Sequence, residues 1–165
     1  MSDLGVLDLH SNKLSGPIDV VFQIESRFPE GTLSFVDLSD NHFSGEIEQI
    51  GTGPHNMIGF LNLSNNYLTG RLVGSIGKLI SMWSLDLSYN SLGFELLESL
   101  VNVSSLVKLK LQRNRFTGEI PNGFLKLKAL LREQDLSDNL LVGRIPQGSP
   151  LSDFPTSSFS RNRGL

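Results

Sequence analysis

An asparagine recurs along this chain at intervals of 24 to 29 residues, and apolar residues keep fixed positions around it. Counted from each Asn, apolar side chains fall at positions −8, −5, −3, +2 and +6, usually with a Gly at +4. Six copies fit this frame, and we call their central residues the ladder asparagines: Asn12, Asn41, Asn66, Asn90, Asn114 and Asn139. Self-similarity at such a period indicates a solenoid, in which each repeat stacks on the next.

Each repeat contains a stretch in which apolar and polar residues alternate, which is typical of a strand with one buried face. We expect parallel strands at one offset from every ladder Asn, at residues 7–9, 36–38, 61–63, 85–87, 109–111 and 134–136. Apolar residues three apart after the Gly, such as Ile76 and Leu79, favour a 3₁₀ or helical turn. The pattern predicts an α/β solenoid, a right-handed arc of six repeats with strands on the concave face and these turns on the convex face.

The ladder asparagines have a structural interpretation. An Asn that turns inward after the strand can donate through its amide and accept through its carbonyl oxygen, so it can bridge backbone groups of adjacent coils. Two residues depart from the frame. Gln134 stands where the other repeats have an aliphatic residue, and without a partner its amide costs on the order of 1–3 kcal/mol. Phe94 replaces the usual Gly, which predicts an altered bend with Gly93 as its substitute.

The ends of the chain differ from its middle. We expect one solenoid domain over residues 1–146 and an extended tail over 147–165, which is rich in Pro and Ser and has no periodicity. Phe154 and Phe159 either fold back as a partial cap or belong to a disordered terminus. The first strand follows Met1 so closely that the amino end is expected to be uncapped. An uncovered strand edge favours self-association.

Composition excludes several classes of protein. A net charge of −3 and a pI near 5.6 argue against nucleic-acid binding, which needs a dense basic face. The chain has no Cys, no signal sequence and no apolar run of membrane-spanning length. Its three histidines share no metal-ligand spacing, and no grouping typical of a catalytic triad or phosphate loop occurs. We therefore expect no enzyme activity, no metal and no cofactor.

A column of carboxylates is the most tempting sign of chemistry. Four repeats place an Asp at position −4: Asp8, Asp37, Asp86 and Asp135. These residues would line up on neighbouring strands about 4.8 Å apart, but Asn62 and Lys110 interrupt the column. We interpret it as a solvated face rather than as a catalytic carboxylate pair.

The element Asn-x-Leu-x-Gly-x-Ile-Pro, complete over residues 114–121 and 139–146, resembles the plant-type leucine-rich repeat. The likeness covers nearly the whole chain and is best to the ectodomains of plant receptor-like proteins and leucine-rich-repeat receptor kinases. It implies extracellular recognition, at the plasma membrane, of a peptide, hormone, microbial component or partner ectodomain such as a co-receptor. The final residues 162–165 match the family tail just before its Cys, so the chain resembles a fragment without the family's leader, cap and membrane span.

Specificity in such a solenoid is expected at the outward strand positions. The candidate partner-binding residues are Phe35, Phe60, Tyr89, Lys108, Lys110 and Arg113. Aromatic side chains on a polar face suit anchoring of a partner, whereas the basic residues also suit plain charge pairing with Asp86, Glu133 and Asp135. Asn62 and Asn102 lie in sequons for N-glycosylation. Alternatives to a receptor-like recognition module are a secreted inhibitor of the polygalacturonase-inhibitor type and a truncated relic without function.

Overall fold

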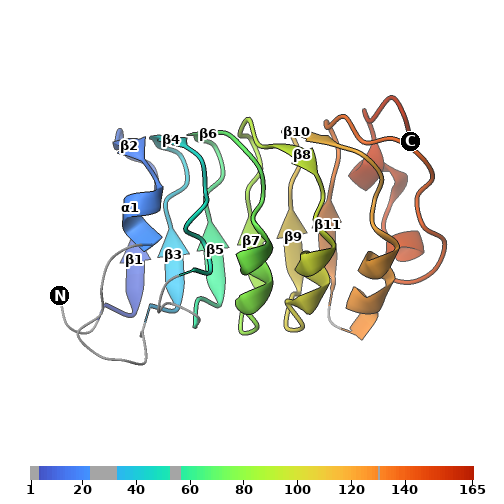
Figure 1. Ribbon diagram of the computed structural model, residues 1–165, viewed down its shortest axis with the longest axis horizontal. Coiled ribbons are helices and arrows are strands. Elements are labelled where there is room, and N and C mark those ends of the chain that lie inside the picture. The colour runs from blue at the N-terminus through green and yellow to red at the C-terminus, as the bar shows by residue number, and fades with distance from the viewer. Residues whose placement is uncertain (1–3, 23–32, 53–56, 130) are drawn as a thin grey trace.

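Six short parallel strands form one sheet whose order follows the sequence. The computed structural model describes residues 4–22, 33–52, 57–129 and 131–165. The strands of this concave sheet are β1 (Val6–Asp8), β3 (Phe35–Asp37), β5 (Phe60–Asn62), β7 (Ser84–Asp86), β9 (Lys108–Lys110) and β11 (Glu133–Asp135). They lie side by side along the length of the molecule, as Figure 1 shows, so each repeat contributes one coil. The expected solenoid of parallel strands is confirmed.

Each strand begins and ends one residue earlier than the sequence predicted. The inward residue of the pattern is therefore the middle of the strand, as in the register of Leu61 with Leu85. The next apolar residue, for example Leu38, is buried but already lies in the turn. Asp37 starts that turn, because its Oδ1 accepts hydrogen bonds from the backbone N–H and the hydroxyl of Ser39 at 3.0 and 2.6 Å.

A second set of strands, which the sequence did not predict, runs along one flank. It comprises β2 (Ser15–Pro17), β4 (His42–Gly45) and β6 (Tyr67–Leu68) in one sheet, and β8 (Gly93–Glu95) and β10 (Arg115–Thr117) in another. These strands follow the ladder Asn of their repeat, and they lie along the upper edge in Figure 1. The flank therefore adds backbone hydrogen bonds between coils.

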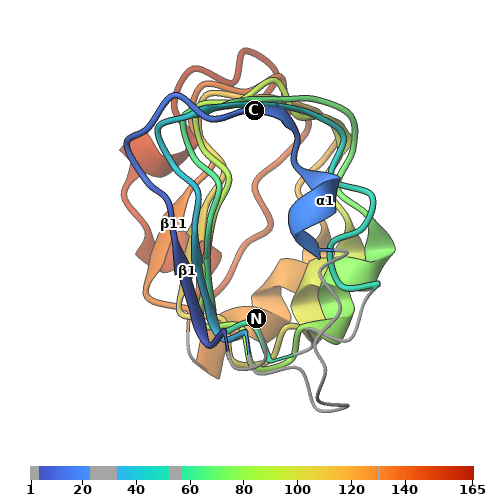
Figure 2. The ribbon, with the colours of Figure 1, turned by 90° about the vertical axis from the view of Figure 1, so that its left-hand side faces the viewer.

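Short helices form the convex wall, opposite the concave sheet (Figure 2). It contains α1 (Asp19–Phe22) and the 3₁₀ helices η1 (Gly74–Lys78), η2 (Glu98–Asn102) and η3 (Asn122–Ala129). Figure 2, seen along the solenoid, shows β1 and α1 on opposing walls. Ile76, Leu79 and Leu100 point into the space between the walls and are fully buried. The expected 3₁₀ turns are confirmed, and they close a single core shared by neighbouring coils.

The bend at position +4 is left-handed in the repeats that carry Gly there, with φ between 72° and 107°. In the fourth repeat Phe94 itself takes this conformation, with φ of 65°, whereas Gly93 is not in the left-handed region. The expectation that Gly93 substitutes was wrong, because the bend is fixed by the stacking of coils and not by the residue type. A bulky residue held there costs about 1–3 kcal/mol. The guanidinium of Arg71 lies 4.9 Å from the centre of the Phe94 ring.

The segment after Pro146 was expected to be an extended tail, but it forms short helices. It contains η4 (Leu151–Asp153) and η5 (Thr156–Phe159), and the side chain of Phe159 is buried in the core. The carbonyl oxygen of Ser158 accepts a hydrogen bond of 2.7 Å from the backbone N–H of Leu136, just beyond β11. This segment therefore continues the stack as a further coil without a strand.

Candidate functional site

The ladder asparagines bridge consecutive coils. Nδ2 of Asn41 donates to the carbonyl oxygen of Leu9 in the preceding coil at 2.9 Å, and to that of Leu38 in its own coil at 3.3 Å. Its Oδ1 accepts from the backbone N–H of Leu14 in the preceding coil at 3.0 Å. The same two bonds to the preceding coil, one from Nδ2 and one to Oδ1, occur at Asn66, Asn90, Asn114 and Asn139. Asn12 donates to the carbonyl oxygens of Leu9 and His10 in its own coil. These side chains are occupied by the backbone, so they do not contribute to a binding surface.

Asn162 is a further ladder residue that the sequence analysis missed. Its Nδ2 donates to the carbonyl oxygen of Leu136 at 2.9 Å, and its Oδ1 accepts from the N–H of Leu141 at 3.1 Å. It follows Asn139 by 23 residues and has Phe159 at position −3. That spacing was the available signal, but the Pro and Ser residues before it concealed the periodicity.

The aromatic candidates on the concave sheet lie together. The rings of Phe35 and Phe60 are stacked, with centroids 4.2 Å apart and an interplanar angle of 4°. Trp83, which the sequence analysis passed over, packs on Phe60 at 5.4 Å and is 48% exposed. It precedes β7 and occupies position −7, outside the alternating stretch, although it is the only Trp in the chain. The cluster therefore spans three consecutive coils.

The two lysine candidates share one carboxylate. Nζ of Lys108 lies 3.8 Å and Nζ of Lys110 lies 4.0 Å from Oε2 of Glu133 on the neighbouring strand. The expected pairing of Lys110 with Asp86 and Asp135 does not occur as an ion pair within 4 Å among the described residues. Lys110 stands opposite Asp135 in the register, but its side chain reaches diagonally to Glu133, whose side chain is longer than that of Asp. These exposed ion pairs add at most about 1 kcal/mol each to stability.

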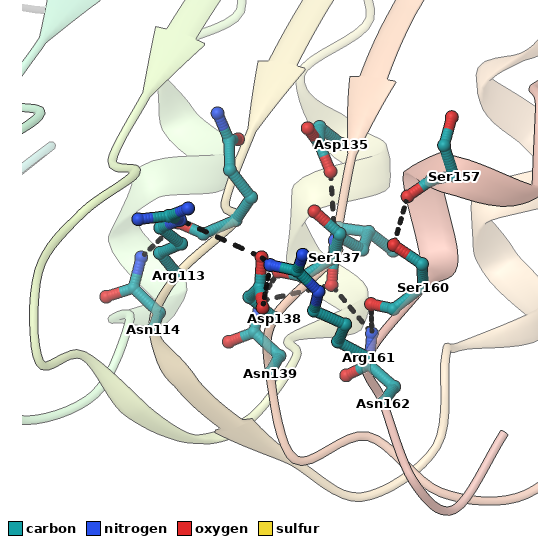
Figure 3. A network of polar contacts seen from close by, with 12 residues as sticks. Arg113, Asn114, Asp135, Ser137, Asp138, Asn139, Ser157, Ser160, Arg161 and Asn162 are labelled. Carbon is teal, nitrogen blue, oxygen red and sulfur yellow. Dashed lines mark hydrogen bonds and ion pairs between the residues drawn. The ribbon is translucent and has the colours of Figure 1, made fainter.

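The remaining candidates, Tyr89 and Arg113, lie past the strand ends at position −1. The guanidinium of Arg113 sits 4.8 Å from the centre of the Tyr89 ring, and its Nε lies 3.8 Å from Oδ2 of Asp138. Arg161 approaches the same carboxylate at 3.2 Å, so Asp138 is held between two arginines (Figure 3). Tyr89 and Arg113 thus form a separate group at the edge of the concave face.

The aspartates at position −4 have a local structural task. Oδ1 of Asp86 accepts from the N–H and hydroxyl of Ser88, and Oδ1 of Asp135 accepts from the N–H of Ser137. At the first repeat, Nδ1 of His10 lies 2.6 Å from Oδ1 of Asp8. This hydrogen bond lowers the pKa of Asp8 and raises the pKa of His10 relative to their ordinary values.

The described residues offer little for metal chemistry. They contain no group of three or more His, Asp or Glu side chains placed to hold a metal ion, and His55 lies outside the described residues. Within the same part of the chain, the helices are too short to cross a membrane. Asn102 is exposed at the end of η2 on the convex side, whereas Asn62 lies on the concave sheet and donates to Asp37 at 3.2 Å.

Together, the repeat, the stacked parallel strands and the ladder asparagines define a leucine-rich-repeat solenoid. A family model described as Leucine Rich Repeat matches residues 58–79 and 105–127. Receptor-like protein 39 of Arabidopsis thaliana is 38% identical over 124 residues, which cover 73% of this chain and 13% of that protein. Receptor-like protein 53 of the same plant is 36% identical over 156 residues, covering 93% of this chain and 15% of that protein. The chain is therefore a plant leucine-rich-repeat protein of the receptor-like type.

Two further matches bear on function. The crystal structure of the Arabidopsis receptor kinase HAESA, in complex with a peptide hormone and a co-receptor, superposes with a TM-score of 0.83 at 29% identity. The match covers 96% of this chain and 25% of that one. Polygalacturonase inhibitor 2 of Arabidopsis thaliana is 36% identical over 105 residues, which cover 64% of this chain and 31% of the inhibitor. The chain thus spans a minor part of the length of each of these proteins.

Proposed function

We propose that this chain is a noncatalytic recognition module from the extracellular part of a plant receptor-like protein, and that its concave face binds a peptide or a co-receptor ectodomain. The observation that carries this proposal is the set of outward side chains that depart from the repeated Asp and Ser pattern. Phe35, Phe60 and Lys110 all lie on the concave sheet, while the inward residues are committed to the core. The relatives that are receptors for peptide hormones support the same use of the fold.

A displayed library of random 12-residue peptides, selected against the purified chain, tests this proposal. Peptides that bind the concave face should lose at least tenfold in affinity for Lys110→Glu, and their remaining binding should depend less on salt. Lys78→Glu is the matched control, because Lys78 is an exposed lysine in η1 on the convex wall. Selected peptides that bind the chain and both variants equally well would contradict a concave site. A fall in the stability of Lys110→Glu without any change in affinity would leave Lys110 with a structural role only.

A second candidate function is inhibition of a cell-wall-degrading enzyme. It is favoured by the match to a polygalacturonase inhibitor, although this match covers less of the chain than the matches to receptor-like proteins 39 and 53 do. The experiment is a polygalacturonase assay with increasing amounts of the chain. A dose-dependent loss of hydrolysis would support this candidate, and unchanged hydrolysis at a large molar excess would exclude it for the enzyme assayed.

We also propose that the chain self-associates through the outer edge of β1. Among the described residues β1 pairs only with β3, so its other edge presents backbone groups that a second strand can pair with. Val6 on this strand is 58% exposed. Sedimentation equilibrium over a hundredfold range of concentration tests the proposal, and Val6→Lys should weaken any association. A single monomer mass across the whole range would contradict it.

A further inference from the structure

Outward apolar side chains form a continuous stripe across the first four coils. Val6, Phe35 and Phe60 stand opposite one another in the registers of β1, β3 and β5. Trp83 extends this row by packing on Phe60. We call these four residues the apolar stripe. In the next two coils the same column of the sheet carries Lys108 and Glu133, so the stripe ends within the concave face.

Trp83 lies against Gly59 of the preceding coil. A Cβ atom at Gly59 would lie 3.0 Å from Nε1 and 3.1 Å from Cδ1 of the indole, so the missing side chain leaves the space that Trp83 fills. The core beneath is already complete, since the inward residues Val36, Leu61 and Leu85 are fully buried. The stripe is therefore not needed to close the core, and its rings are available to a partner.

Charge is distributed very unevenly along the chain. The described residues up to position 60 include six acidic and one basic residue, whereas those from 101 to 165 include five acidic and ten basic ones. Because the coils stack in sequence order along the molecule, this difference in sequence becomes a difference in space (Figure 1). The end that carries the apolar stripe is acidic, and the opposite end is basic.

Carboxylates flank the stripe directly. Asp8 and Asp37 follow Val6 and Phe35 by two residues on the same strands, and residues two apart in a strand lie on the same face. Asp37 uses Oδ1 to hold Ser39, and its Oδ2 accepts a hydrogen bond from the amide of Asn62 at 3.2 Å. A partner that lies on the stripe therefore meets apolar side chains and negative charge together. The carboxylates attract cations, and the apolar side chains suit an apolar group.

We propose that the apolar stripe binds a peptide segment that carries basic side chains around a bulky apolar residue. This inference rests on the proposed peptide recognition by the concave face, and it adds the chemistry of the ligand. The segment places its apolar residue against Phe60 and Trp83 and its cations near Asp8 and Asp37. A segment with acidic side chains at these positions would place like charges together.

Trp83 reports on the stripe, because it is the only Trp in the chain. The probes are two matched tripeptides with blocked ends, Lys-Phe-Lys and Glu-Phe-Glu, titrated while the emission of Trp83 is recorded. The basic probe should saturate with a Kd at least fivefold lower than that of the acidic probe, and added salt should reduce the difference. In Asp37→Asn the preference should fall at least twofold. Asn keeps the local turn, since Asn62 holds Ser64 through its Oδ1 at 3.1 Å in the same way.

Glu98→Gln is the matched control, because Glu98 is exposed on the convex wall, and it should keep the full preference. Equal affinities for the two probes, or no response of Trp83 to either, would overturn this inference. The proposed function is tested separately by the peptide selection, because the readout of that selection is the effect of Lys110→Glu and not the emission of Trp83. Emission that changes with the concentration of the chain alone would assign the stripe to a second copy, and that result also would overturn the proposal.

Discussion

Replacement of Gln134 by Leu should stabilise the fold. Gln134 is the middle residue of β11, is 3% exposed, and stands opposite Leu109 in the register with β9. Neither its side-chain oxygen nor its nitrogen has a hydrogen-bond partner within the described part of the chain. A buried polar group without a partner costs about 1–3 kcal/mol, so the two atoms of this amide together are expected to cost about 2–4 kcal/mol.

Leu removes that cost with nearly the same side-chain volume and restores the aliphatic residue of the other repeats. At about 2–4 °C per kcal/mol for a chain of this size, the melting temperature should rise by roughly 5–15 °C. In urea the midpoint should increase while the slope m stays constant, which would show that stability and not compactness has changed. The opposite exchange, Leu109→Gln, places an amide at the matching position of β9 and should lower stability by about 2–4 kcal/mol. A midpoint for Gln134→Leu that is unchanged or lower would refute the reasoning.

Three other perturbations have defined outcomes. Asn66→Ala should lower the free energy of unfolding by about 2–4 kcal/mol, because it leaves buried backbone groups in two coils unpaired, whereas Asn62→Ala should lower it by about 1 kcal/mol or less. Equal urea midpoints for these variants would contradict the bridging role. Phe94→Gly should stabilise by about 1 kcal/mol by relieving a left-handed backbone, and a lower midpoint would show that its stacking outweighs the strain. Asp8→Asn should return the raised pKa of His10 to its ordinary range in an NMR titration. The pKa of His10 is raised in the folded chain, so its contact with Asp8 stabilises the fold fully at a pH below the ordinary pKa of His. This stabilisation disappears as the pH rises through the raised pKa of His10.

The period of the sequence was sufficient to predict the stack of coils and its parallel sheet. It was not sufficient to predict the flank strands or the backbone conformation at Phe94. Leu61, Leu85 and Leu109 recur at one offset, so their inward direction and the parallel sheet followed directly. The flank strands were not predictable in this way, because their pairing comes from backbone groups that the stacking aligns. The bend at Phe94 shows the same influence, since the neighbouring coils impose a conformation that the residue disfavours.

For the candidate site, the sequence identified which columns face outward but not which side chains meet. Phe35 and Phe60 were expected on adjacent strands, and their stacking follows from that register. Trp83 was missed because its contact with Phe60 depends on the space above Gly59, which belongs to another repeat. The partner of Lys110 was misassigned because the reach and direction of its side chain decide between carboxylates at similar positions.

The ladder asparagines from Asn41 onward all pair with the coil that precedes their own. Asn66 pairs with the carbonyl oxygen of Leu38 and the N–H of Phe43, both in the coil made before it. During translation, a newly emerged coil therefore keeps these two groups exposed until the ribosome has added the Asn of the next coil. Folding on the ribosome should then lag synthesis by one repeat and proceed from the amino end. Asn162 does the same for the coil of Asn139, because it pairs with the carbonyl oxygen of Leu136 and the N–H of Leu141.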